Sequence, residues 1–289
     1  MGIISTIIQA IIQGITEFLP VSSSGHLSLY QHFTGESGEG GLLLSVFLHL
    51  GTLLAVFIAF RDTIWALIKE FGRLCKDVVS GKFKWSEMNG ERRLIFMLIF
   101  STAMLIPFFV FKDFFTGISE DSSILAEGFC FLYTSVILFL ADRFANGKKI
   151  PKDITVKDAV VVGAFQGVAL LPGVSRSGST ISSGLLRGFS RDTAVRYAFI
   201  LGIPAILGGC LTEAVDAAKG EVQFYPVEFV IGFFVAMVVG LLSIKMVSWL
   251  LKSDKFKIFS IYTFILGVLV IGVSIYEIVT GNIVSVNIR

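Results

Sequence analysis

The sequence has few charged residues and few cysteines, and both shortages narrow the class of protein. Only 16% of its 289 residues are Asp, Glu, Lys or Arg, whereas 54% are hydrophobic, which excludes an ordinary soluble globular protein. The three cysteines lie far apart and form no CxxC pair, so neither a disulfide framework nor a cysteine metal site is expected. A basic N-terminal region followed by a small-residue cleavage site is also missing, so we expect no cleaved signal peptide.

Long apolar segments recur along the whole chain. Each is close to the length of about 20 residues that a helix needs to cross a membrane. Helices satisfy their own backbone polar groups in lipid, so we predict an all-α polytopic membrane protein. Six transmembrane helices are expected, at about 41–60, 94–111, 124–141, 194–215, 227–249 and 258–280. Two further apolar segments, 2–32 and 158–186, are broken in the middle, and each is predicted to form a re-entrant helical hairpin.

Basic residues are distributed unevenly between the two ends of these helices. Residues 62–93 combine apolar side chains at helical spacing with several Lys and Arg, which predicts an amphipathic helix on the membrane surface. Because basic loops stay in the cytoplasm, the charge-rich side is predicted to be cytoplasmic and both termini extracytoplasmic. Twenty of the 24 Lys and Arg residues lie in the four segments 61–93, 142–158, 187–196 and 245–257.

One polar motif occurs twice, and its two copies predict the architecture. Three predicted crossings separate the copies, and an odd number reverses their direction in the membrane. We therefore predict a single membrane domain, 1–289, built from inverted repeats of about 1–150 and 151–289, with the two hairpin tips meeting near the midplane. At an offset of 153 positions the identical pairs are Gln13 and Gln166, Gly14 and Gly167, Val21 and Val174, Ser22 and Ser175, Ser24 and Ser177, and Gly25 and Gly178.

The first copy, QGITEFLPVSSSGH, contains a carboxylate in an apolar segment. Gln13 and Glu17 are four residues apart and share one helical face. Intramembrane acids are usually functional, although Glu17 could also be protonated against a neighbouring helix or lie at a water-filled mouth. A new helix is expected to begin after Pro20, with its free N–H groups forming an anion site at Ser22, Ser23, Ser24 and Gly25.

Ser23 and His26 are three residues apart at the start of this second helix. Residues at that spacing can lie on one face, which suits a nucleophile with a proton-transfer partner. Simple helix capping by the serines is the alternative interpretation.

The second copy, PGVSRSGST, places Arg176 where the first copy has Ser23. An unpaired guanidinium near the midplane is very unfavourable, whereas one that faces a phosphate makes short bidentate hydrogen bonds. A salt bridge to Glu17 is the alternative, and it could be the resting state of the same site. A phosphate or diphosphate is therefore the expected ligand, with further contacts predicted from Ser175, Ser177, Gly178, Ser179 and Thr180.

Oxygen ligands in the first copy suggest a cation. Glu17 with the Gln13 amide could hold Mg²⁺ or Ca²⁺, with phosphate oxygens completing the shell. His49 is a weaker candidate for the site, and Glu127 and Glu213 are intramembrane acids without a visible partner. His32 is interpreted as a loop residue, and Arg187, Arg191 and Arg196 as inner-leaflet anchors.

The segments QGITEFLPVSSSGHL (13–27) and LPGVSRSGST (171–180) resemble the two signature segments of the bacterial undecaprenyl-diphosphate phosphatase family linked to bacitracin resistance. The resemblance implies a bacterial plasma-membrane enzyme that converts undecaprenyl diphosphate to the monophosphate carrier lipid for cell-wall synthesis. It also implies a divalent cation and a site open to the outer leaflet. Carried over by motif, the implied functional residues are Gln13, Glu17, Ser23, His26, Ser175 and Arg176. Some members have Glu where this chain has Gln13, which puts a two-carboxylate metal site in doubt.

The resulting hypothesis assigns a role to each group. Arg176 and the helix N-termini clamp the diphosphate, Ser23 attacks the terminal phosphorus and His26 transfers protons, while a direct His26 nucleophile or an activated water stays open. A transporter of a phosphate-bearing polyprenyl lipid is the competing class. Undecaprenyl diphosphate and membrane lipids are the expected partners, a homodimer is left open, and no nucleic acid is expected.

Overall fold

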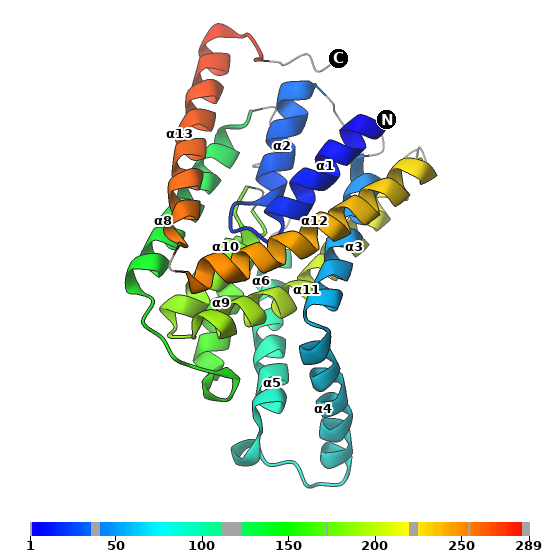
Figure 1. Cartoon of the computed structure of the whole chain (residues 1–289), viewed down its shortest axis with the longest axis vertical. Coiled ribbons are helices and arrows are strands. Elements are labelled where there is room, and N and C mark those ends of the chain that lie inside the picture. Colours follow the sequence, from blue (N-terminus) through cyan, green and yellow to red (C-terminus); the bar gives the residue numbers. More distant parts are fainter. Residues whose placement is uncertain are drawn as a thin grey trace.

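The computed structural model describes residues 2–35, 41–110, 123–171, 173–219, 225–253 and 255–284, which fold into a helical bundle (Figure 1). Its helices are α1 (Ile3–Thr16), α2 (Ser23–Thr34), α3 (Gly41–Ala59), α4 (Arg61–Val79), α5 (Gly90–Ala103), α6 (Leu105–Val110), α8 (Leu125–Phe144), α9 (Val156–Val168), α10 (Arg176–Leu186), α11 (Arg191–Ala217), α12 (Pro226–Lys252) and α13 (Lys257–Thr280). Two short 3-10 turns, η1 (Trp85–Glu87) and η2 (Pro151–Asp153), lie in the connections.

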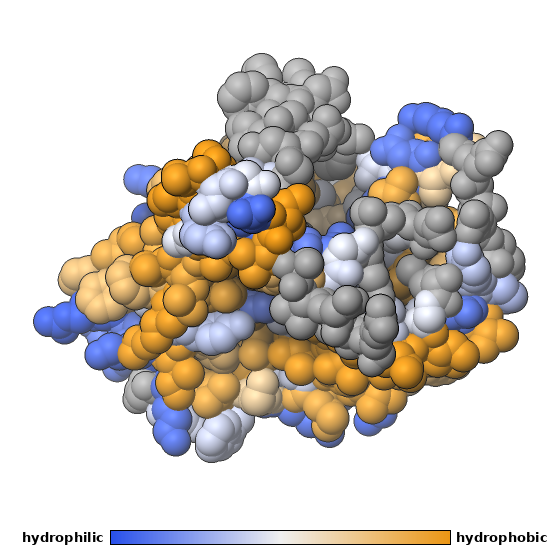
Figure 2. Space-filling view, turned by 90° about the horizontal axis from the view of Figure 1, so that it is seen from above, coloured by the Kyte–Doolittle hydropathy of each residue, from blue (hydrophilic) through white to orange (hydrophobic). Residues whose placement is uncertain are grey.

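Five helices are long and apolar enough to cross a membrane: α3, α8, α11, α12 and α13. Many of their large apolar side chains are exposed on the outside of the bundle, as expected for a surface that faces lipid. Figure 2, a view of the end at which α1 begins and α13 ends, shows apolar residues along most of the visible rim. The prediction of an all-helical, multi-pass membrane protein is confirmed.

The expected span at 94–111 is not one continuous helix. α5 ends at Ala103 and the short α6 begins at Leu105. Pro107 lacks the N–H that would continue the α5 hydrogen-bond ladder to Ala103, which explains a break one turn before it. The part of the chain that the structure describes therefore contains five membrane-length helices, one fewer than predicted.

The amphipathic segment after α3 is helical, but it does not lie across the end of the bundle. α4 continues the line of α3 and packs against α5 (Figure 1). Its Glu70 is only 3% exposed and accepts from Arg92 at 2.7 Å, and Arg92 also binds Asp77 at 2.8 Å. These ion pairs hold α4 against α5. The amphipathic helix is therefore present, and its position on a membrane surface stays a prediction.

Both broken segments form two half-length helices, α1 with α2 and α9 with α10, and they begin their second halves in the same way. The Oγ of Ser22 accepts from the backbone N–H of Gly25 at 3.2 Å, and the Oγ of Ser175 accepts from Gly178 at 3.0 Å. Within the described ranges, Ser22 is the one residue other than glycine with a positive φ, 74°. Such strained backbone is typical of functional sites.

The two breaks contact each other directly. The backbone N–H of Gly173 donates to Ser24 Oγ at 3.2 Å, and the Oγ of Ser177 donates to the Leu19 carbonyl at 3.0 Å. Each hairpin therefore supplies a serine hydroxyl to the loop of the other. The two copies of the polar motif lie side by side, as their repetition predicted.

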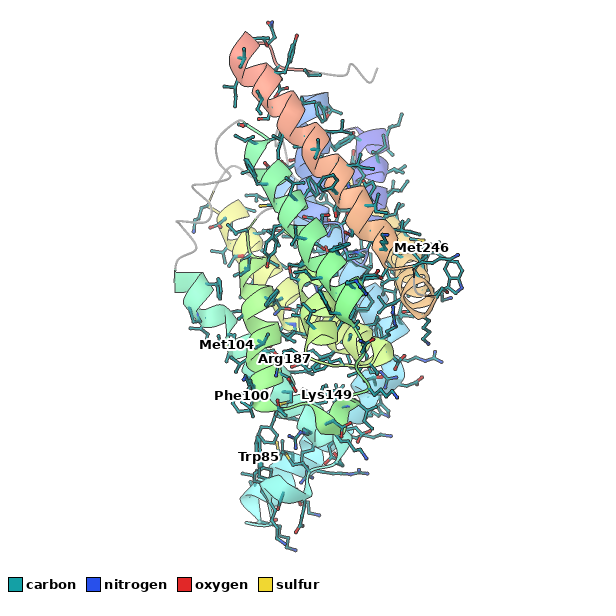
Figure 3. All side chains as sticks on the ribbon, turned by 90° about the vertical axis from the view of Figure 1, so that its left-hand side faces the viewer. Trp85, Phe100, Met104, Lys149, Arg187 and Met246 are labelled. Carbon is teal, nitrogen blue, oxygen red and sulfur yellow. The ribbon has the colours of Figure 1, made fainter. Side chains whose placement is uncertain are left out.

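A buried charge cluster fixes the base of the second hairpin. Asp158, in the first turn of α9 and outside the five membrane-length helices, is fully buried and accepts from Lys149 Nζ at 2.7 Å and Arg187 Nε at 2.8 Å. Figure 3 labels the two partners, Lys149 and Arg187. Burial by itself raises the pKa of Asp158, but hydrogen bonds from Lys149, Thr155 and Arg187 outweigh it and hold the pKa below its usual range. Asp158 thus ties the start of α9 to the end of α10, the helix whose first residue is Arg176.

Candidate active site at the crossing of the two hairpins

A cavity of about 270 Å³ lies where the two hairpins meet. The end of α1, the break and the first turn of α2 form one wall, while α9 and α10 with the loop between them, α3 and α11 supply the rest. Its polar lining consists of Thr16, Glu17, Ser22, Ser23, Ser24, His49, Gln166, Ser175, Arg176, Ser177 and Glu213. Its apolar lining consists of Ala169, Leu170, Leu171, Val174, Ala205, Ile206, Gly209 and Cys210.

Glu17 is the centre of the polar lining. Its side chain is buried, and its Oε1 is paired with the guanidinium of Arg176. Its Oε2 accepts from Gln13 Nε2 at 2.9 Å and from the hydroxyl of Ser23 at 2.7 Å. The salt bridge that the sequence left open is therefore formed. It joins the first copy of the motif to the second and compensates two charges that would otherwise be costly in a membrane protein.

Arg176 reaches Glu17 by lying directly over the backbone of α11. A Cβ placed on Gly202 would collide with the Nη1 of Arg176, so the absence of a side chain there leaves the space that the guanidinium occupies. α10 supplies the other constraint, because Ser175 caps the helix and Arg176 is its first residue. Two elements far apart in sequence thus fix the position of one charge.

Gly202→Ala is expected to lower catalytic turnover by about 10- to 100-fold while the protein still folds, because the new methyl group displaces the guanidinium by a fraction of an ångström to an ångström. The control is Gly208→Ala, two turns along the same helix, where an added Cβ meets no atom within 4 Å. Phosphate release and elution of both variants from a sizing column in detergent measure the two effects. Equal activity of the two variants would show that the position of Arg176 is unimportant.

His26 does not pair with Ser23. Its Nδ1 donates to the Ser22 carbonyl at 2.7 Å, and its Nε2 accepts from the hydroxyl of Tyr262 at 2.7 Å. The imidazole also stacks on Tyr262 and contacts the edge of Phe131, and it is absent from the cavity lining. The i, i+3 argument failed because Ser23 is the first residue of α2 and its side chain turns back toward α1. In the structure the hydroxyl of Ser23 therefore donates to Glu17 and not to His26.

The other predicted binding residues divide into two groups. Four serines line the cavity: Ser22 and Ser175, which cap their helices, and Ser24 and Ser177, which bind the opposite break. The remaining five, which include Gln13 beside Glu17, lie outside the lining. Gly25 packs against Phe131, Gly178 packs against Ser175 and Pro20, Thr180 donates to the Arg176 carbonyl at 2.9 Å, and Ser179 is buried in α10.

Three further residues line the cavity: His49, which the sequence offered as a weaker candidate, and Gln166 and Glu213, which were not predicted as site residues. His49 Nδ1 donates to the Ser45 carbonyl at 2.9 Å, which leaves Nε2 facing Glu17 Oε2 at 3.9 Å. Gln166 is the repeat partner of Gln13, a signal that the sequence did contain. Glu213 is a single acid near the end of a long apolar helix, and no spacing marks it.

The remaining polar candidates have partners away from the cavity. Glu127 accepts from Ser28 at 2.8 Å, and His32, which lies in α2 and not in a loop, contacts Glu277 at 2.9 Å. The three arginines contact protein groups at the charge-rich end: Arg187 binds Asp158, Arg191 donates to the Leu251 carbonyl at 2.8 Å, and Arg196 pairs with Asp192 at 3.1 Å.

Comparison with known proteins gives a consistent result. Residues 6–269 match the family described as bacitracin resistance protein BacA. The undecaprenyl-diphosphatase of Alkaliphilus metalliredigens is 38% identical over 275 residues, covering 94% of this chain and 98% of that protein. That of Carboxydothermus hydrogenoformans is 38% identical over 275 residues, covering 94% and 97%. Undecaprenyl-diphosphatase 3 of Bacillus cereus strain ATCC 10987 is 37% identical over 273 residues, with the same coverage.

Proposed function

Because the chain belongs to the bacitracin resistance protein BacA family, we propose that its cavity hydrolyses undecaprenyl diphosphate to undecaprenyl phosphate and inorganic phosphate. The observation that carries this assignment to particular residues is the buried pair of Glu17 and Arg176, with the Ser23 hydroxyl 2.7 Å from the same carboxylate. This arrangement places a guanidinium that can bind phosphate, a hydroxyl that can act as nucleophile and a carboxylate that can act as base within one small volume.

The diphosphate binds by replacing a carboxylate. Arg176 presents a planar fork of N–H donors, and a phosphate accepts from that fork in the same bidentate manner as a carboxylate does. The terminal phosphate of the substrate takes the place of Glu17 on Arg176. The starts of α2 and α10, where free backbone N–H groups gather, add positive potential on both sides of it.

Ser23 then attacks the terminal phosphorus. Release from Arg176 restores the basicity of Glu17, which accepts the Ser23 proton as the Oγ–P bond forms. The bond between the terminal phosphorus and the bridging oxygen breaks, and undecaprenyl phosphate leaves with that oxygen. Water next attacks the phosphoserine, releases inorganic phosphate and restores the Ser23 hydroxyl. Direct attack by water, or by His26, is the alternative that substitution of Ser23 distinguishes.

His26 has a positioning role in this scheme. Its hydrogen bond to the Ser22 carbonyl and its contact with Tyr262 hold the strained turn that carries Ser22 and Ser23. The alternative role of His26 as a proton shuttle requires its side chain to leave Tyr262 and rotate into the cavity.

We also propose that the chain is an inverted repeat in a bacterial plasma membrane, with α1–α2 and α9–α10 as re-entrant hairpins and α5–α6 as the sixth crossing. The helix pairs support a two-fold relation: α1 packs on α12 while α9 packs on α5, and the equivalent helices α3 with α11, and α8 with α13, pack on each other. The charge-rich end that carries α4 is then cytoplasmic. The side on which α1 begins and α13 ends (Figure 1) is then extracytoplasmic, and we propose that the cavity opens toward the outer leaflet on that side.

A divalent cation, Mg²⁺ or Ca²⁺, is part of the proposal, but Glu17 does not fit as its ligand. Without substrate, both carboxylate oxygens of Glu17 are occupied by Arg176, Gln13 and Ser23. In the reaction above the carboxylate released from Arg176 is the base for Ser23, a role with which a bound cation would compete. Gln13 Oε1 is buried without a partner among the described residues and is one available oxygen. The described ranges also contain no cluster of three His, Cys, Asp or Glu side chains that could hold a metal ion. The reaction above therefore has no step that depends on a cation at Glu17.

Phosphate release from a defined prenyl diphosphate by the purified protein in detergent tests the proposed function. We expect stoichiometric conversion to the prenyl monophosphate. A lipid that crosses vesicle membranes with its diphosphate intact would instead establish the transporter alternative.

A further inference from the structure

Among the described residues, the buried side chain of Gln166 and the buried Oε2 of the half-buried Glu213 have no hydrogen-bond partner in the cavity. Gln166 is 1% exposed, and within the described part of the chain neither its Oε1 nor its Nε2 has a hydrogen-bond partner. Glu213 lines the same cavity, and its Oε2 is also buried without a partner among the described residues. Buried polar atoms without partners are rare and point to a ligand or ion that completes them.

We propose that Gln166 and Glu213 form a second subsite of the cavity that binds a divalent cation, Mg²⁺ or Ca²⁺, together with phosphate oxygens of the substrate. The subsite lies on α9 and α11, whereas the cation expected from the sequence was placed on α1. The part of this proposal in which phosphate oxygens of the substrate bind the cation rests on the proposed function.

Charge balance in the cavity supports a cation. Glu17 and Arg176 compensate each other, so the carboxylate of Glu213 is the remaining charge among the lining residues that has no partner of opposite sign. A diphosphate entering this volume would be repelled by that carboxylate. A divalent cation between them removes the repulsion, because it binds carboxylate and phosphate oxygens at once.

The donor types also match a hard cation. Mg²⁺ and Ca²⁺ prefer carboxylate, amide and phosphate oxygens, and Mg²⁺ in particular is usually held by one or two carboxylates plus substrate phosphates. Gln166 Oε1 and the Glu213 carboxylate supply the protein oxygens. Two protein ligands are too few for a site of their own, which agrees with the absence of a three-residue His, Cys, Asp or Glu cluster in the described ranges. We therefore expect cation and diphosphate to bind cooperatively.

Binding of Mn²⁺, measured by electron paramagnetic resonance on the purified protein in detergent, tests this subsite without relying on activity. The measurement is made with and without a prenyl methylenediphosphonate, which resists hydrolysis. Glu213→Gln and Gln166→Leu are each expected to weaken Mn²⁺ binding in the presence of the analogue by roughly tenfold or more. Gln166→Glu adds a second carboxylate and is expected to tighten it, a gain that misfolding cannot produce.

Matched variants decide the outcome. Asp216→Asn removes a charge from the same helix, at a residue paired with Lys219 outside the cavity, and should leave Mn²⁺ binding unchanged. Wild-type affinity for Mn²⁺ in Glu213→Gln would overturn the subsite. A loss of Mn²⁺ binding confined to Glu17→Gln would also overturn it and would return the cation to α1. If Glu213 were protonated and donated to phosphate, Mn²⁺ binding would not depend on its charge. Glu213→Gln would then keep the wild-type affinity for Mn²⁺, which also overturns the subsite. Phosphate release by the wild-type protein is measured separately, so failure of the proposed hydrolysis is distinguished from failure of the subsite.

Discussion

Replacing Arg176 with alanine is expected to lower kcat/KM for phosphate release from a prenyl diphosphate by about 10³-fold or more. Arginine groups that stabilise a transferring phosphoryl group contribute rate factors of this size. Arg176 is the one Lys or Arg in the cavity lining that the structure describes, and it lies at the start of α10 beside Ser23 and Glu17, the proposed nucleophile and base. Arg176→Lys keeps the charge and loses the planar fork, so it should recover only part of the activity.

Loss of stability must be separated from loss of catalysis in this variant. Removing Arg176 leaves Glu17 buried without its partner, which costs about 3–5 kcal/mol in typical buried pairs. The double variant Glu17→Gln with Arg176→Met removes both charges and should unfold nearer to the wild-type temperature, yet it should be as inactive as Arg176→Ala. Arg196→Ala, at an exposed pair with Asp192, is the control. Near-normal phosphate release by Arg176→Ala would refute the clamp.

Ser23→Ala is expected to lower kcat by about 10³-fold or more, with a smaller effect on KM, because the hydroxyl is needed in the transition state more than in binding. Glu17→Gln should have a similar effect, since the amide cannot accept the Ser23 proton. Rapid acid quenching of the wild-type protein with a substrate labelled in its terminal phosphate should trap the label on Ser23.

The matched control for this prediction is Ser28→Ala, farther along α2, where the hydroxyl donates to Glu127 outside the cavity. Full activity in Ser23→Ala would exclude the serine nucleophile. If His26→Ala were inactive in the same assay, the imidazole would take its place. Activity in both variants would leave water activated by Glu17.

The sequence predicted the pairing of the two motifs because the repeat and the chemistry agree. Gln13 with Gln166 and Ser22 with Ser175 fix the offset, and the structure keeps the two serines in the same role as helix caps. The Glu17–Arg176 contact follows from the same logic, since each would be an isolated charge in an apolar environment. Repetition and charge compensation are properties of the residues themselves and are therefore visible in the sequence.

What the sequence did not predict depends on rotations and on tertiary contacts. Ser23 and His26 are three residues apart, which suggested a common helical face. The turn at Ser22, with its φ of 74°, instead directs Ser23 toward Glu17 and His26 toward Tyr262. Glu213 reaches the cavity through the packing of α11, which no local pattern records. The orientation of α4 depends on Arg92, which lies beyond the loop and binds Glu70.

In the proposed mechanism the Glu17 carboxylate has a further consequence, because it competes with the substrate for Arg176. It pairs with the guanidinium of Arg176 in the phosphate-free cavity. The affinity for every phosphate ligand would then be its intrinsic affinity multiplied by the small fraction of time that Arg176 is free. A diphosphate, with its larger charge, overcomes this competition better than either monophosphate product does. The return of Glu17 to Arg176 therefore favours product release and lets turnover continue in a membrane where the monophosphate lipid accumulates.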